Sequence, residues 1–164
     1  MSGGAASPGG SDQIVTGAAQ SASLADWMAV AAGMIGALMA LMDTSIINAA
    51  LPVIQGEIGA TPSEGTWVGT SYLVAEIVII PLTAWLQRML GMRRLLLSMG
   101  TMFVLFSLVC ATAGNLETMI LGRIGQGLTG GALIPSALTI VSQRLPTRQQ
   151  PVGMAMVAMT ALIG

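Results

Sequence analysis

The sequence predicts an all-α protein, a polytopic helical bundle in a membrane, from three observations. The first is composition, because 54% of the 164 residues are hydrophobic and only 8% are charged. The mean hydropathy is +0.80, whereas about a quarter of the residues in a soluble domain are charged. The second is a series of apolar runs of membrane-spanning length. The third is that the arginines between these runs fall in alternate loops.

Four apolar runs are long enough to cross the hydrocarbon core of a bilayer, which takes about 20 helical residues. They cover residues 27–50, 67–86, 95–113 and 119–141. A fifth run begins near Val152 and contains about 13 residues, fewer than a span needs. We therefore expect residues 27–164 to be the N-terminal part of a longer bundle. Residues 1–26, rich in Gly, Ala, Ser and Gln, are expected to form a disordered cytoplasmic tail.

The arginines predict the orientation, because loops rich in arginine stay on the cytoplasmic side of a membrane. The loops after the second and fourth runs contain Arg88, Arg93, Arg94, Arg144 and Arg148. The other two loops contain Glu57, Glu64 and Glu117 and no basic residue. This pattern predicts a cytoplasmic N-terminus.

Proline marks the ends and weak points of the runs. We expect Pro52 to end the first span, because proline lacks the N–H that continues a helix. Pro81 and Pro135 fall inside the second and fourth spans. There we expect kinks, which membrane helices tolerate when neighbouring helices or water satisfy the freed carbonyl groups.

Three ionisable residues lie within the apolar runs: Asp43 in the first, Glu76 in the second and Arg123 in the fourth. Each costs about 2.5–3.5 kcal/mol of apparent insertion free energy at the centre of a spanning helix, so chance retention is a poor explanation. At a rise of about 1.5 Å per residue, the three groups fall at similar depths below the outer ends of their spans. We predict that they share one layer and face a polar cavity.

Small and polar residues repeat at helical spacing around these charges, which predicts that the charges point inward. The stripes are Gly36, Ala40, Asp43 and Ile47; Tyr72, Glu76 and Thr83; and Arg123, Gln126, Gly127, Gly130 and Ile134. Two plainer interpretations stay open. Asp43 and Arg123 can form a structural ion pair that titrates nothing, and Glu76 can be solvated in a water-filled vestibule.

The residue types argue against several other functions. The chain has no histidine, which excludes a His-based triad or metal site, and we predict no cofactor, no metal and no enzymatic activity. Gly125, Gly127 and Gly130 spell G-x-G-x-x-G, but a nucleotide site also needs a preceding strand and an acid about 20 residues later. No Asp or Glu follows Glu117. The scattered arginines disfavour a nucleic-acid partner, and we assign the single cysteine, Cys110, to helix packing.

Three segments resemble the major facilitator superfamily, and within it the drug:proton antiporters of the EmrB/QacA type. The stretch DTSIINAALP, from Asp43 through Asn48 to Pro52, is similar to the first-span signature D-x-T-I-V-N-V-A-L-P. The stretch WVGTSY, which ends at Tyr72, is similar to the second span, as is the later Pro-Leu pair at 81–82. RIGQG, which begins at Arg123, resembles the fourth-span motif R-x-x-Q-G.

The loop after the second span resembles the superfamily motif G-x-L-a-D-r-x-G-r-r only in part. It matches at Leu86, Gly91 and Arg93, whereas Ala84 stands for the first glycine and Arg88 for the aspartate. The gating contact that the family makes through this aspartate is therefore not carried over to this chain.

The resemblance implies that the chain is a partial N-terminal lobe of a major facilitator fold. In that fold two lobes of inverted three-helix repeats enclose a substrate cavity that opens to alternate sides. The resemblance also implies a multi-pass protein of the bacterial inner membrane, and a proline- and glycine-containing motif shortly after Gly164. The partners would be the lipid bilayer, a small-molecule substrate, protons and a periplasmic adaptor protein.

The predicted function of the complete protein is proton-coupled efflux of small amphiphilic or hydrophobic compounds, as in a multidrug exporter. Asp43 would be the coupling acid, modulated by Arg123, because a change of exposure or partner makes a buried acid take up or release a proton. Glu76 would be a second acid or a cation contact, and Gln126 would hold Arg123 or a water by hydrogen bonding. The alternatives are a small multi-span scaffold or assembly protein without transport activity, and an importer or uniporter of the same fold.

Overall fold

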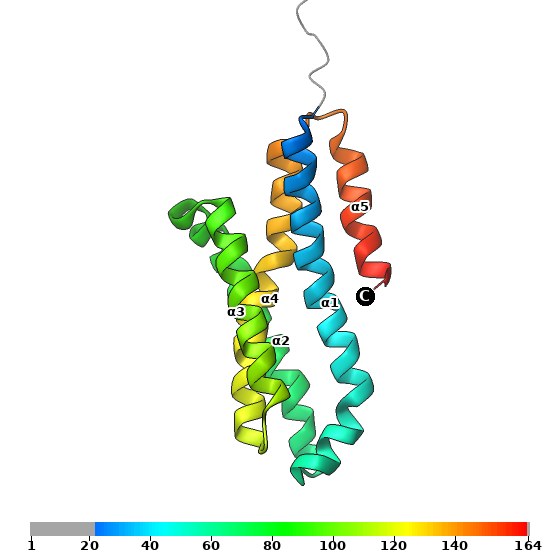
Figure 1. The fold of residues 1–164 in the computed structure, drawn as a ribbon, viewed down its shortest axis with the longest axis vertical. Helices are drawn as coiled ribbons and strands as arrows, with labels where there is room; N and C mark the ends of the chain where they lie inside the picture. Colours follow the sequence, from blue (N-terminus) through cyan, green and yellow to red (C-terminus); the bar gives the residue numbers. More distant parts are fainter. Residues whose placement is uncertain (1–21, 164) are drawn as a thin grey trace, which may run out of the picture.

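The computed structural model describes residues 22–163, and this range is helical without any strand. Five helices follow one another along the chain (Figure 1): α1 (Leu24–Ile58), α2 (Pro62–Leu90), α3 (Met92–Ala111), α4 (Leu116–Arg144) and α5 (Gln150–Ile163). They run alternately up and down, so the protein is an all-α helical bundle. Residues 1–21, which make up most of the predicted disordered tail, lie outside the described residues.

The helices α1 to α4 have the length and composition of membrane spans, and α5 is a shorter apolar helix. α1 alone has 35 residues, which at about 1.5 Å per residue exceeds the roughly 30 Å of a hydrocarbon core. The protein is therefore a multi-pass membrane protein whose first helix extends beyond the apolar layer.

Helix caps explain why α1 and α2 begin before the apolar runs. α1 begins at Leu24 because Ser23 and Asp26 form a capping box, in which the Ser23 N–H donates to Asp26 Oδ2 at 3.1 Å. α2 begins in the same way, with Thr61 and Glu64 satisfying each other's backbone N–H groups. Such boxes satisfy N–H groups that a helix start leaves without a partner, so residues 24–26, expected in the tail, are helical.

The expectation that Pro52 ends the first span is wrong. α1 continues through Pro52 and ends at Ile58, where Gly59 adopts φ 66° and donates its N–H to the Gln55 carbonyl. Pro52 lacks the N–H that would bond to the carbonyl of Asn48, a loss that membrane helices tolerate where a neighbouring group or water satisfies the freed carbonyl. The left-handed glycine, and not the proline, ends the helix.

The loops divide the bundle into two chemically different ends (Figure 1). The arginine end holds the start of α1 and the α2–α3 and α4–α5 loops, with Arg88, Arg93, Arg94, Arg144 and Arg148. The glutamate end holds the α1–α2 and α3–α4 loops, with Glu57, Glu64 and Glu117. At the arginine end, Arg144 Nη1 lies 3.6 Å from Asp26 Oδ1 in a partly exposed ion pair.

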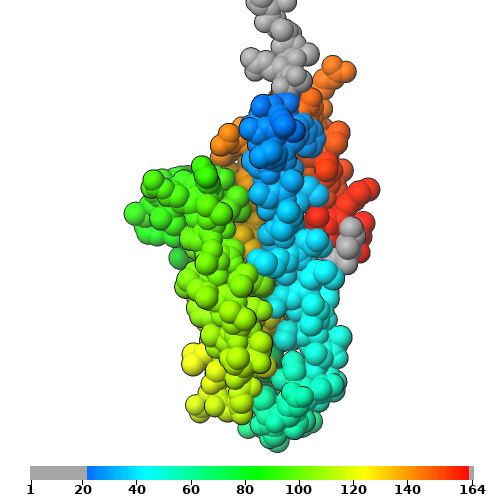
Figure 2. Space-filling model, viewed as in Figure 1, coloured from blue at the N-terminus to red at the C-terminus, as the bar shows by residue number. Residues whose placement is uncertain are grey.

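α4 is the central helix and contacts each of the other four. Figure 2 shows α1 and α3 in front of the middle of α4, which is visible as a narrow strip between them and again at its two ends. Glycines make this close approach possible. A Cβ added at Gly127 would overlap the backbone carbonyl of Tyr72, and one at Gly125 would overlap the ring of Phe106. The glycines of the G-x-G-x-x-G pattern therefore pack α4 against α2 and α3.

The half of the bundle toward the arginine end has an apolar core. Here α1, α4 and α5 meet through Val30, Ala37, Ala137, Ile140, Val141, Leu145 and Val157, all buried. Gly33 allows α1 to approach α4 closely, because a Cβ there would lie 3.1 Å from the Ala137 Cα. We call this group of residues the apolar core.

Candidate functional site

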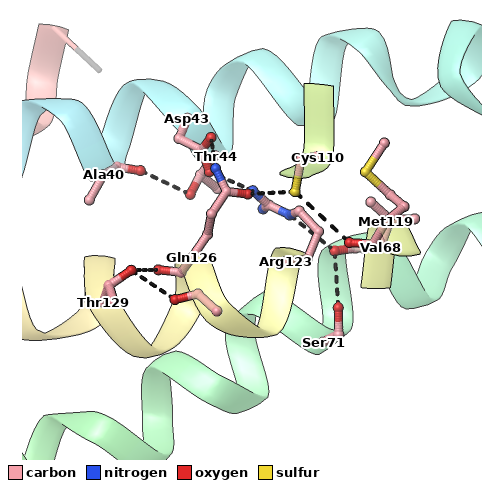
Figure 3. Close-up of polar contacts among 11 residues, drawn as sticks. Ala40, Asp43, Thr44, Val68, Ser71, Cys110, Met119, Arg123, Gln126 and Thr129 are labelled. Carbon is pink, nitrogen blue, oxygen red and sulfur yellow. Dashed lines mark hydrogen bonds and ion pairs between the residues drawn. The ribbon is translucent and has the colours of Figure 1, made fainter. Parts of the chain in front are cut away.

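A buried ion pair joins α1 to α4 in the other half of the bundle (Figure 3). Arg123 Nη1 lies 2.5 Å from Asp43 Oδ2. The guanidinium also donates through Nε to the Val68 carbonyl at 3.3 Å, and its central carbon lies 4.3 Å from the centre of the Tyr72 ring. Arg123 therefore contacts α1 through a carboxylate and α2 through a carbonyl and an aromatic face.

Gln126 completes the polar contacts of both charged groups. Its Oε1 accepts from Arg123 Nη1 at 3.1 Å, and its Nε2 donates to Asp43 Oδ1 at 2.8 Å. Each Asp43 carboxylate oxygen therefore has one donor. The side-chain orientation of Gln126 is fixed, because only its oxygen can accept from a guanidinium and only its nitrogen can donate to a carboxylate.

The local sequence of α1 and α4 explains why these side chains meet. Arg123 and Gln126 are three residues apart in a helix, so they lie on the same face. Opposite them, Ala40 is 1% exposed, and Gly36 faces the side chain of Leu133. Small residues at these positions bring the two backbones close enough for Asp43 to reach the guanidinium.

The two charged groups differ in their access to solvent. The side chain of Arg123 is 1% exposed, whereas that of Asp43 is 15% exposed. Within residues 22–163, every buried side-chain nitrogen and oxygen has a hydrogen-bond partner. A guanidinium keeps its charge in proteins, whereas a carboxylate can be protonated. Asp43 is thus the more accessible member of the pair.

Glu76 does not join this group. It lies on the α2 face that meets α4, where a Cβ added at Gly131 would be 2.8 Å from its Cγ. Within the described part of the chain, it makes no hydrogen bond or ion pair with Asp43 or Arg123. The structure therefore brings together Asp43 and Arg123 but leaves the third predicted charge apart.

The remaining predicted residues occupy three different places. Tyr72 and Gly127 lie within the junction of α2 and α4, as described above. Asn48 and Pro52 are exposed on α1 toward the glutamate end. Gly91 separates α2 from α3 with φ 76°, a conformation that favours glycine, and Arg93 is exposed in the first turn of α3.

Two groups that contact the ion pair or Gln126 could not be predicted from the sequence. Cys110 of α3 lies with its Sγ 3.2 Å from Gln126 Oε1, and the backbone carbonyl of Val68 accepts from Arg123. Backbone acceptors carry no residue-type signal, and an apolar run gives no reason to orient a thiol toward a particular helix. The capping boxes were detectable, because Ser or Thr followed three residues later by an acid marks a helix start.

No set of three or more His, Cys, Asp or Glu side chains able to hold a metal ion occurs among residues 22–163. We call Asp43, Arg123, Gln126 and Cys110 the polar junction. Hydrogen bonds connect its carboxylate, guanidinium, amide and thiol.

Comparison with known proteins identifies the family. Residues 33–164 match the Major Facilitator Superfamily. The chain belongs to the major facilitator superfamily. This family consists of transporters and, in general, not of enzymes.

Relatives within the superfamily are resistance and export proteins. The chain is 36% identical over 137 residues to the fatty acid resistance protein FarB of Neisseria gonorrhoeae, covering 84% of this chain and 27% of that protein. It is 37% identical over 137 residues to the probable multidrug resistance protein EmrY of Escherichia coli K12, with the same coverage. It is 37% identical over 125 residues to the multidrug export protein EmrB of Haemophilus influenzae, covering 76% of this chain and 24% of that protein. The chain thus spans about a quarter of the length of these relatives.

Proposed function

We propose that the complete major facilitator protein is a proton-coupled exporter of small amphiphilic or hydrophobic compounds in the bacterial inner membrane, with a cytoplasmic N-terminus. The relatives named for drug export, drug resistance or fatty acid resistance support the substrate class. The arginine-rich loops at one end support the orientation. A periplasmic adaptor is a further partner that the resemblance to EmrB-type exporters suggests.

The observation that supports proton coupling best is the set of contacts around Arg123. Gln126, the Val68 carbonyl and the Tyr72 ring hold the guanidinium independently of Asp43. If Asp43 is protonated and moves away from Arg123, the guanidinium keeps three partners and is not buried without polar contacts. Asp43 can therefore act as the mobile member of the pair while Arg123 stays fixed on α4.

In this mechanism Asp43 links a proton to the position of α1. Ionised Asp43 binds Arg123 and Gln126 and holds α1 against α4. Protonation removes the ion pair, which weakens this contact and lets α1 shift relative to α4 as the cavity opens to the other side. Glu76, half-buried and without a cationic partner among residues 22–163, serves as a second acid or as a contact for cationic substrates.

The test is proton-coupled efflux by the complete protein with Asp43→Asn. Asparagine has nearly the same shape but cannot exchange a proton, so substrate-driven proton movement should be lost. Asp26→Asn is the matched control, because Asp26 lies on the same helix in a partly exposed ion pair with Arg144. That variant should transport normally.

Unchanged coupling in Asp43→Asn would remove Asp43 from the mechanism and leave the ion pair as a structural contact. Loss of folding in Asp43→Asn, detected as aggregation in detergent, would also identify a structural contact. The orientation has a separate test, in which Thr147→Cys and Gly114→Cys are compared in a Cys110→Ala background. A membrane-impermeant thiol reagent applied to intact cells should label residue 114 and not residue 147.

A further inference from the structure

A polar cavity lies at the arginine end, between the ends of three helices. Its volume is about 340 Å³, and it is lined by Ala84, Gln87 and Arg88 of α2, Met92 of α3, and Thr139 and Gln143 of α4. We propose that this cavity binds the phosphate headgroup of an anionic phospholipid. The proposal concerns a site separate from Asp43 and Arg123 and does not depend on proton coupling.

The side chains around the cavity offer donors to an anion. Arg88 is exposed and, within residues 22–163, has no carboxylate partner. One N–H of the Gln87 amide donates to Ser136 Oγ at 3.2 Å, and the second N–H can donate to a ligand. Gln143 of α4 is exposed and lines the cavity. A guanidinium and two amides around one cavity can bind phosphate oxygens through several hydrogen bonds, and those from the guanidinium are strong.

The surrounding charges also favour an anion. Five arginines lie at this end, and Asp26 is the one acid there among the described residues. Asp26 faces Arg144 and so does not neutralise Arg88. Arg88 is the charged side chain that lines the cavity, and it makes the cavity cationic.

The start of α3 adds a fixed partial positive charge to the cavity wall. Met92 is the first residue of α3, and the preceding Gly91 has no side chain to cap the helix. Of the first backbone N–H groups, that of Leu95 bonds to the Gly91 carbonyl, whereas the groups before it have no partner within the helix. Such a helix start favours negative charge, whereas the ends of α2 and α4 at the same cavity carry the opposite partial charge, so the preference for an anion comes from the side chains.

The position of the cavity favours a phospholipid over a free anion. Ala84 and Met92 give it apolar walls, and Trp85 and Met89 beside it are 57% and 65% exposed. These apolar side chains lie where α2 ends, near the boundary between hydrocarbon and headgroups. A phospholipid would place its phosphate in the cavity and its acyl chains over the apolar surface, as basic pockets between membrane helices do with anionic lipids.

Native mass spectrometry of the complete protein, purified in detergent and stripped of lipid, tests this proposal. The probes are phosphatidylglycerol, phosphatidylcholine and inorganic phosphate. Phosphatidylglycerol should bind, and Arg88→Gln should weaken this binding about tenfold through loss of a charged hydrogen bond. Arg148→Gln is the matched control, because it removes an exposed arginine at the same end that does not line the cavity.

The outcomes separate the possible sources of the signal. Selective loss in Arg88→Gln, with phosphatidylcholine binding weakly throughout, supports the site. Equal loss in Arg88→Gln and Arg148→Gln would mean attraction by the total charge of this end and would overturn it. Inorganic phosphate that competes away the lipid at equal concentration would identify a free-anion site in place of a phospholipid site. The absence of any preference for phosphatidylglycerol would also overturn the proposal.

Discussion

The two halves of the α1–α4 contact use opposite chemistry. Toward the arginine end, the helices meet through the apolar core, where Gly33 lies against Ala137. Toward the glutamate end, the same helices meet through Asp43 and Arg123. In the apolar half, α1 and α4 meet without any charged group. In the other half, they meet through charges whose burial costs free energy, and the proposed proton exchange at Asp43 concerns this half alone.

The two halves should also respond differently to change. Apolar contacts are lost in proportion to the buried groups that are removed. The polar junction responds to loss of Arg123 in a different way, because this loss leaves the Asp43 carboxylate without its opposite charge. Four substitutions, ordered from the largest expected effect to the smallest, test this difference.

Arg123→Leu should have the largest effect. It leaves Asp43 facing Gln126 alone, and the loss of one partner of a buried pair costs about 3 kcal/mol or more. Thermal unfolding of the complete protein in detergent measures this cost, with Arg148→Leu as an exposed control. The double variant Asp43→Leu/Arg123→Leu should recover much of the lost stability. A double variant no more stable than Arg123→Leu would contradict the argument.

Gly127→Ala should have the next largest effect. The added Cβ would overlap the Tyr72 carbonyl, and forced shifts in a packed interior cost about 1–3 kcal/mol. Gly69→Ala on α2 is the control, because a Cβ there meets nothing within 4 Å. The control should be neutral or more stable, since alanine favours helix over glycine. If both variants unfold at the same temperature, α2 and α4 do not approach as described.

Val141→Ala samples the apolar core. The residue is fully buried, and removal of two methyl groups should cost about 1.5 kcal/mol. Proton-coupled efflux per folded molecule should stay unchanged in Val141→Ala, whereas it should be lost in Asp43→Asn. Loss of coupling in Val141→Ala at full folding would break the distinction between the two halves.

Cys110→Ala should have the smallest effect. It removes the thiol contact to Gln126 Oε1, but Gln126 keeps Arg123 and Asp43 as partners, so the cost should be about 0.5–1 kcal/mol. Cys110→Ser, which keeps a donor, is the comparison. Unfolding temperatures of both variants measure the difference. A loss as large as that of Arg123→Leu would place Cys110 at the centre of the junction.

The sequence predicted the contact between Asp43 and Arg123 better than it predicted the helix ends. A contact between Asp43 and Arg123 could be predicted because charged residues are costly and rare within membrane spans, and those that occur usually pair with one another. Glu76 satisfied the same criteria, yet its side chain lies against α4 at Gly131. The position of a residue along its span predicts how deep the side chain lies in the membrane. It does not predict which neighbouring helix the side chain contacts.

Pro52 illustrates the limit for helix ends. Proline weakens a helix locally, but the cost depends on whether the freed carbonyl finds a partner or solvent. Ser23 and Asp26 show the reverse case, since a local capping pattern set the helix start within an otherwise polar segment. Local hydrogen bonding, more than hydropathy, decides where these helices begin and end.

By itself the sequence determined the class of the protein, because hydrophobic runs, arginine placement and buried charges follow from the solvent properties of a bilayer. Only the tertiary structure decided which side chains meet. Gln126 bridges both members of the ion pair, Cys110 reaches it from α3, and Arg88 lines a cavity with α4. These contacts depend on how closely the glycines let α4 approach its neighbours, and that distance is a property of the packed bundle.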